Sequence, residues 1–342
     1  MRFCRTGGSA RPRRTESFGG GPRRSYWHLA VLACTVGLSS GAAAGEYEVR
    51  IDVTEDVRAL GSADAFEWEP AADRLSALGP AAWPVLLRAL EAEGPATREG
   101  IVGVLASGTE ADDAVLQGLG RVARADPEED VRVVAVQASR KLGGEKSTDV
   151  IVGALGDPSP AVRRAAITAC TKLCTTEASL ARLVELALAD EPLSNSLQAQ
   201  RVLYGLTSEG KDAAITMKVR AGAAAAFEKS EKGQPSEGGR DQRALLAALL
   251  LAQIDDASRV DLLAAATAAE QPLAIRGHAV HALGRLGSAG QVPLLAELLR
   301  DSALSLYAYD ALRRMSERGI VEAKAPASAY TGPRAPELLP RP

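Results

Sequence analysis

The chain has 342 residues, of which 46% are apolar, only 4% are aromatic and 24% are charged. A core of Ala, Leu and Val suits closely packed helices and argues against an aromatic-rich β-sandwich or barrel. Seven arginines and one glutamate give the first 24 residues a charge of +6, so the formal −3 of the whole chain leaves −9 on the remainder. A body of that sign has no general attraction for nucleic acid or for an anionic membrane.

Residues 1–44 have the order of a secretory signal peptide. A long basic segment precedes the apolar run LAVLACTVGL at 29–38, which leads to small residues ending in three alanines. Ten apolar residues are too few to span a bilayer, so we expect cleavage after Ala44, export to the periplasm or cell envelope, and no integral membrane span in the mature chain. Two alternatives remain open. The VLAC sequence resembles a bacterial lipoprotein box that would be lipidated at Cys34, and RRSYW at 23–27 resembles a twin-arginine signal.

A lead-in at 45–64 follows the leader. Its EYEVRIDV sequence alternates between polar and apolar residues like a short strand. Because a single strand has no evident pairing partner, we interpret this segment as extended chain.

A repeat of about 31 residues dominates the rest of the sequence. The frame D-P-x-x-x-V-R-x-x-A begins at Asp126 and again at Asp157, and a copy one residue shorter begins at Gln271. Asp-Pro is typical of a helix start, and Val, Ala, Ala and Leu at spacings of 4, 3 and 4 form one apolar helical stripe. A closing Gly lets the chain leave the helix. A second apolar helix follows each first one.

The period predicts an all-α solenoid of stacked helical hairpins over 65–320, with about seven or eight repeats in one elongated, monomeric domain. First helices are expected at 70–78, 95–106, 127–142, 158–173, 192–206, 243–254, 272–286 and 302–315. Second helices are expected at 82–90, 112–124, 148–155, 180–188, 260–268 and 292–299.

This pattern resembles the short bacterial HEAT repeat, also called the PBS-lyase HEAT-like type. The resemblance implies an α-solenoid superhelix in which Asp and Arg form a ladder between neighbouring repeats. The residues of this sequence that match the ladder are Asp126, Arg132, Asp157, Arg163 and Arg276. Some proteins with such repeats are similar to bilin lyases, which attach chromophores, but an export signal argues against that chemistry here.

Two segments break the period. In 208–242 we expect an irregular helix at 221–227 and then a solvated loop, KSEKGQPSEGGRDQ, because the loop is rich in Gly, Pro, Ser and charge. The Pro-rich tail at 321–342 is expected to be disordered.

Cys170 and Cys174 lie four residues apart on one predicted helix. A disulfide between them would require the helix to end there. The simpler interpretation is two small buried thiols, although an oxidising compartment leaves the disulfide open.

The sequence contains no complete catalytic or metal-binding motif. His278 and His281 could present two imidazoles to one metal ion, but no third ligand lies at a suitable spacing. Acidic pairs lie at helix starts, where they complement the helix dipole. We therefore expect no cofactor and no enzymatic activity.

These patterns together favour an exported scaffold that binds a protein partner through the concave face of the solenoid. We expect the second helices to line that face, so Arg88, Arg121, Arg124 and Arg182 could contact the partner at its rim. The alternatives are an envelope lipoprotein that assists assembly and, less in keeping with export, a bilin-lyase-like enzyme.

Overall fold

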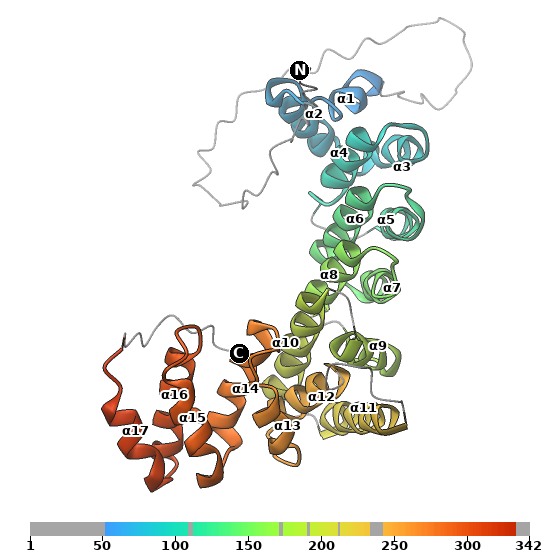
Figure 1. Cartoon of the computed structure of the whole chain (residues 1–342). Helices are drawn as coiled ribbons and strands as arrows, with labels where there is room; N and C mark the ends of the chain where they lie inside the picture. Colours follow the sequence, from blue (N-terminus) through green and yellow to red (C-terminus); the bar gives the residue numbers. More distant parts are fainter. Residues whose placement is uncertain are drawn as a thin grey trace, which may run out of the picture. The chain divides into compact units, whose positions relative to one another are not determined.

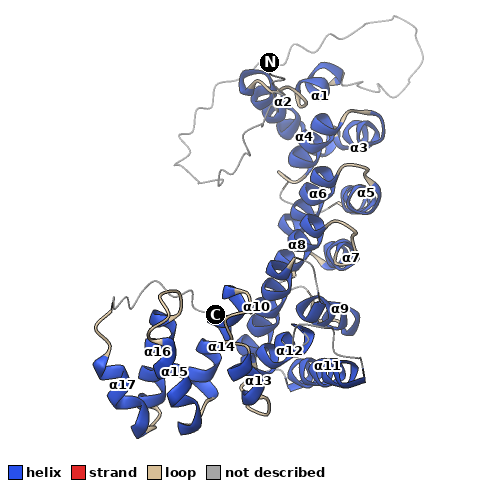
Figure 2. Ribbon diagram, viewed as in Figure 1, coloured by secondary structure: helices blue, strands red, loops and turns tan. Residues whose placement is uncertain are grey.

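A computed structural model describes residues 52–108, 112–170, 174–189, 192–210, 213–232 and 242–332. All regular secondary structure in these ranges is helical, as Figure 2 shows. The predicted leader, its cleavage site and Cys34 lie outside the described residues. No helix in the described part of the chain combines the length and apolar character needed to cross a bilayer.

Helices occupy the positions that the period predicted. The first helices of the repeats are α2 (Ala65–Leu78), α4 (Pro95–Leu105), α6 (Glu129–Leu142), α8 (Pro160–Ala169), α10 (Leu193–Gly210), α12 (Gln242–Gln253), α14 (Leu273–Leu286) and α16 (Ser305–Glu317). The second helices are α3 (Trp83–Ala92), α5 (Asp113–Ala125), α7 (Glu145–Ala154), α9 (Glu177–Ala189), α13 (Val260–Ala265) and α15 (Val292–Leu298). The remaining elements are α1 (Thr54–Ala59), α11 (Ala213–Lys232), α17 (Lys324–Ala329) and three 3₁₀ turns, Gly79–Ala81, Ala289–Gln291 and Val321–Ala323.

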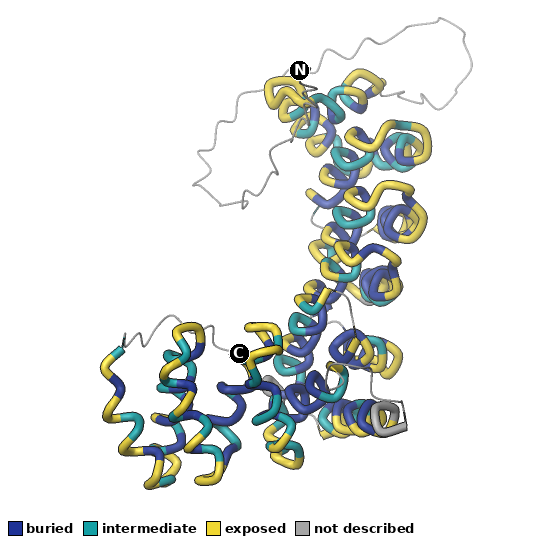
Figure 3. The backbone as a smooth tube through the Cα atoms, viewed as in Figure 1, coloured by how far each residue is buried: buried dark blue, intermediate teal, exposed yellow. Residues whose placement is uncertain are grey.

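The helices stack in two rows through the first half of the array. In one row α4 packs on α6, α6 on α8 and α8 on α10, while α3, α5 and α7 follow one another in the second row (Figure 1). Each first helix turns its apolar stripe inward, and Val131 and Ala135 of α6 are fully buried, as are Val162 and Ala166 of α8. The buried band therefore runs along the stack between the two rows (Figure 3). The structure is the α-solenoid that the sequence predicted.

Small residues set how closely neighbouring helices approach. At Gly284 of α14, a methyl group would lie 2.6 Å from the Cα of Ala311 on α16. This distance is shorter than real carbon contacts, so the α14–α16 junction requires glycine at this position. The high Ala and Gly content thus has a direct packing role.

Two predictions about the ends of the array were wrong. The lead-in contains helix α1, because Val53, Val57 and Leu60 recur at helical spacing and are buried. The tail is ordered as far as residue 332, because the ring of Tyr330 stacks on that of Tyr309 with 5.0 Å between centroids. Each end therefore contributes helix where local polarity or proline content suggested none.

The segment that breaks the period is more helical than its composition indicated. Helix α11 spans Ala213–Lys232, well beyond the expected helix at 221–227, and packs against α9 and α12. It therefore continues the second row at the point where the repeat frame is lost.

Cys170 and Cys174 form a disulfide, so the interpretation as two free thiols was wrong. Helix α8 ends at Ala169, and Cys170 is its C-cap residue, whose N–H still donates to the carbonyl of Ala166 at 3.0 Å. The two cysteine Cα atoms lie 5.0 Å apart. This distance lies within the range that a disulfide tolerates. Both cysteines are completely buried, so the crosslink lies inside the stack.

Candidate functional site

The structure brings the charges of the repeat frame together at the junctions between repeats. Arg132 on α6 reaches forward to Asp157, which precedes α8, with Nε–Oδ2 and Nη2–Oδ1 distances of 2.9 and 3.1 Å. The same guanidinium donates through Nη1 to the carbonyl of Asp126 at 2.8 Å. The side chains of Arg132 and Asp157 are only 12% and 6% exposed. The hydrogen bond to Asp157 raises the pKa of Arg132 above its usual value.

Two further junctions repeat this geometry. Arg98 on α4 forms a bidentate pair with Asp126 at 2.7 and 2.8 Å, although the repeat frame is weak around Arg98. Arg276 on α14 pairs with Asp301, which precedes α16. Arg163 donates to the carbonyls of Asp157 and Pro158 in its own repeat, each at 2.9 Å. Arg98, Arg132 and Arg276 therefore join neighbouring repeats, whereas these bonds of Arg163 lie within its own repeat.

The Asp of each Asp-Pro pair lies two residues before the N-cap residue of its helix, so it does not itself occupy the N-cap position. The Asp126 carboxylate accepts a hydrogen bond from the Glu128 N–H at 3.0 Å, and Asp157 does the same with the Ser159 N–H at 2.8 Å. Ser159 is itself the residue that caps α8. Each Asp thus shapes the turn before the helix through Oδ1, while both of its oxygens accept hydrogen bonds from the arginine of the preceding repeat.

A cleft opens where the repeat frame is interrupted. Helix α10 packs on α8 and α9, whereas α14 packs on α13 and α16, and α12 lies against both α10 and α14. Because α12 is set between them, the side chains of α10 and α14 enclose a space of about 370 Å³. That volume is in the range of small-ligand sites. The residues that line the cleft are Leu197, Arg201, Tyr204, Gln253, Leu273, Ala274, Gly277, His278, His281 and Tyr307.

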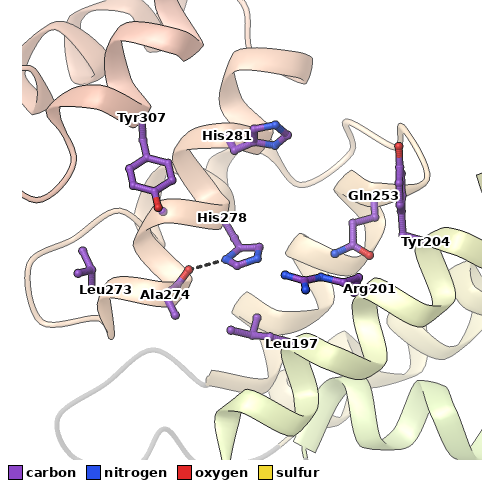
Figure 4. Close-up of a pocket in the computed structure, with 10 residues that line it drawn as sticks. Leu197, Arg201, Tyr204, Gln253, Leu273, Ala274, His278, His281 and Tyr307 are labelled. Atoms are coloured by element: carbon purple, nitrogen blue, oxygen red, sulfur yellow. Dashed lines mark hydrogen bonds between the residues drawn. The ribbon is translucent and has the colours of Figure 1, made fainter. Parts of the chain in front are cut away.

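These residues come from the first helices alone, namely α10, α12, α14 and α16 (Figure 4). We had expected the second helices to supply the functional surface. Two of the arginines on the second helices have carboxylate partners nearby. Arg121 lies 3.7 Å from Glu91, and Arg182 pairs with Glu185 at 2.6 Å. The cleft is the stronger candidate because its polar side chains include some without any such partner.

His281 is one of the residues that line the cleft, and its Nε2 atom is buried without a hydrogen-bond partner in the described structure. Burial lowers its pKa from 6.5 to about 4, and the nearby cations of Arg314 and Arg285 act in the same direction. Arg285 is fixed there because its Nη2 donates to the carbonyl of Ala252 on α12 at 3.1 Å. His281 is therefore a neutral imidazole at neutral pH, with an unused polar atom.

Gln253 presents a second unused polar atom. Its Oε1 is buried and has no hydrogen-bond partner within the described residues, while its Nε2 donates to the Oε1 of Gln200 at 3.4 Å. Gln200 is fully buried and donates in turn to the carbonyls of Ala187 on α9 and Leu246 on α12, at 3.1 and 2.9 Å. A buried polar network from three helices thus orients the Gln253 amide.

Arg201 supplies the positive charge of the cleft, and His278 adds an imidazole beside it. The Nδ1 atom of His278 lies 2.7 Å from the carbonyl of Ala274, which leaves Nε2 available to a ligand. Arg201 on α10 is exposed and forms no ion pair with any described residue. No Asp or Glu is among the residues that line the cleft.

The paired histidines do not complete a metal site. Within the described ranges, no three His, Cys, Asp or Glu side chains gather in a way that could hold a metal ion. His278 and His281 share the cleft, but their neighbours there are neutral or cationic. Among the described residues, the cleft thus supplies two of the three or more ligands that a metal site needs.

A second cleft of about 340 Å³ lies between α3 and α5. Arg98 and Asp126 line it, and these two side chains already form an ion pair. Its charged groups are therefore part of the repeat junction.

Comparison with known proteins agrees with this architecture. A family model described as HEAT repeats matches residues 116–203, which include both strong copies of the Asp-Pro frame. Residues 116–203 are HEAT repeats. No curated protein matches the chain.

Two solved structures are similar to this chain. The crystal structure of Escherichia coli YibA has 16% sequence identity and a TM-score of 0.49, over 78% of this chain and 93% of that one. Human deoxyhypusine hydroxylase in complex with glycerol has 18% identity and a TM-score of 0.30, over 78% of this chain and 96% of that one.

Sequence reasoning singled out the two histidines but missed Arg201, Tyr204, Gln253 and Tyr307. A signal was present on α10, where Asn195, Ser196 and Gln200 are polar residues on a helix that packs on both sides. Buried polar residues of this kind need specific partners, so they mark a junction unlike the ordinary repeats.

Proposed function

We propose that this protein is a non-enzymatic, exported HEAT-repeat scaffold that binds a protein partner, with the contact centred on the cleft between α10 and α14. One observation carries the proposal. The cleft gathers two tyrosines, two histidines and an unpaired arginine at the place where repeat stacking is interrupted. Tyr and Arg are enriched at the energetic centres of protein interfaces.

Export is supported by two features of the chain. The leader has the order of a signal peptide, and the Cys170–Cys174 disulfide is of the kind that persists in oxidising compartments. The mass of the mature N-terminus distinguishes the two modes of processing. A chain that begins at Gly45 supports simple cleavage, whereas a diacylated Cys34 supports an envelope lipoprotein. A full-length cytosolic chain would contradict export altogether.

Site-specific photo-cross-linking in the source cells tests partner binding. A photoreactive phenylalanine analogue replaces Tyr204 in the cleft, and a matched variant carries the analogue at Arg88, an exposed position on α3. The proposal predicts one protein partner cross-linked from position 204 and not from position 88. If neither position yields a cross-linked protein, the scaffold function is wrong. If only position 88 yields one, the partner binds elsewhere on the scaffold.

A further inference from the structure

We propose that the cleft between α10 and α14 recognises an extended acidic segment of the partner, with one Asp or Glu side chain bound at Arg201 and His278. This inference rests on the proposed partner-binding function and adds the chemistry of the segment. It follows from the charge, the unused hydrogen-bonding atoms and the apolar walls of the cleft.

The charge of the cleft differs from that of the rest of the chain. The body carries −9, and its repeat arginines are paired with carboxylates, as Arg98 is with Asp126 and Arg132 with Asp157. Arg201 has no such carboxylate among the described residues, and none lines the cleft. An unpaired guanidinium beside an imidazole forms strong, charge-assisted hydrogen bonds with a carboxylate from outside.

The unused polar atoms suit a peptide backbone. The Oε1 of Gln253 needs an N–H donor, and the Nε2 of the neutral His281 can serve a donor or an acceptor according to its tautomer. Both atoms are buried, so each would gain a partner from a bound segment when its side chain turns toward the cleft, and leaving such atoms unsatisfied is costly.

The walls of the cleft add apolar contact on either side of these groups. Leu197 comes from α10, and Leu273 of α14 is 53% exposed although it is a large aliphatic residue. The ring of Tyr307 on α16 also lines the cleft (Figure 4) and lies over Gly277, where an added Cβ would make ordinary contact with it at 3.6 Å. We expect aliphatic or aromatic residues beside the acidic one in the bound segment.

Selection from a displayed library of random linear peptides tests the inference with the full exported chain as bait. The wild type should enrich peptides with Asp or Glu at one fixed position next to an apolar residue. The R201E variant should lose these peptides, and the R140E variant, which makes the same charge change at an exposed position on α6, should retain them. Enrichment of no sequence, or of sequences without a fixed acidic residue, overturns the inference.

The affinity of one selected peptide gives the quantitative form of the test. Fluorescence anisotropy should show R201E binding at least about tenfold more weakly than wild type, the lower end of what loss of a charge-assisted hydrogen bond costs. Replacing the acidic residue of the peptide by Gln or Asn should have a similar effect. Equal affinities for wild type and R201E would overturn the assignment of Arg201. Complete displacement of the peptide by free glutamate alone would instead make the cleft a small-molecule site.

The failure of this inference and the failure of the scaffold function are distinguishable. If a partner cross-links from position 204 but binds R201E and wild type equally well, the scaffold function stands and the acidic-segment inference is wrong. If no partner is cross-linked, the proposed scaffold function is wrong. A peptide that binds through Arg201 in that case would identify the cleft as an acidic-ligand site without a scaffold role.

Discussion

Replacement of Arg132 by Ala should destabilise the junction between the repeats that begin at 127 and 158 by about 3 kcal/mol. The change removes two hydrogen bonds to Asp157, at 2.9 and 3.1 Å, between side chains that are 12% and 6% exposed. Removing one partner of a buried ion pair costs about 3–5 kcal/mol because the other charge is left without compensation. Asp157 keeps the hydrogen bond from the Ser159 N–H at 2.8 Å, which places the cost toward the lower end.

Urea unfolding followed by circular dichroism measures this cost. Arg121→Ala is the matched control, because Arg121 and Glu91 are 55% and 71% exposed and lie 3.7 Å apart. An exposed pair of this kind contributes about 0–1 kcal/mol. A double-mutant cycle of Arg132→Ala with Asp157→Ala should give a coupling free energy of about 2 kcal/mol or more. If Arg132→Ala shifts the midpoint no further than Arg121→Ala does, the ladder does not hold the repeats together.

Three further predictions concern packing, covalent structure and pH. Gly284→Ala should destabilise the protein by about 1–2 kcal/mol through overpacking. Gly103→Ala should instead stabilise α4 by up to about 1 kcal/mol, because no atom lies within 4 Å of the added methyl group. Urea midpoints that move in the same direction for both variants would contradict this. Digestion with trypsin without reductant should release the peptide with Cys170 linked to the peptide with Cys174, and separate peptides would rule the disulfide out. Lowering the pH from about 6.5 to about 4 should reduce the free energy of unfolding by roughly 1–2 kcal/mol through His281, because the imidazole binds a proton in the unfolded state and not in the folded state. If a His281→Asn variant loses the same free energy of unfolding over this pH range, His281 is not the cause.

The repeat positions could be predicted because each frame residue acts locally. The Asp-Pro turn, the apolar stripe and the closing glycine determine one helix each, and Gly143 does end α6 with a φ of +71°. The pairing of Arg98 with Asp126 was missed because Gly replaces Asp before Pro95, so that copy of the frame is incomplete in sequence although its arginine is in place.

The cleft could not be predicted, since it depends on how non-repeating helices pack. The sequence marks where the period fails, but the place of α12 between α10 and α14 follows from contacts of α11 and α12 with α9. The disulfide and the ordered tail could not be predicted for similar reasons. The disulfide depends on the residue at which α8 ends. The order of the tail depends on the stacking of Tyr330 on Tyr309, which lies 21 positions earlier in the chain.

The central claim is that the interruption of the repeats creates the partner site. The test is isothermal titration calorimetry of the purified partner, once cross-linking has identified it, with wild type, R201E and R140E. We expect R201E to bind at least about tenfold more weakly than wild type and R140E to bind as the wild type does. Equal binding by all three proteins would contradict it.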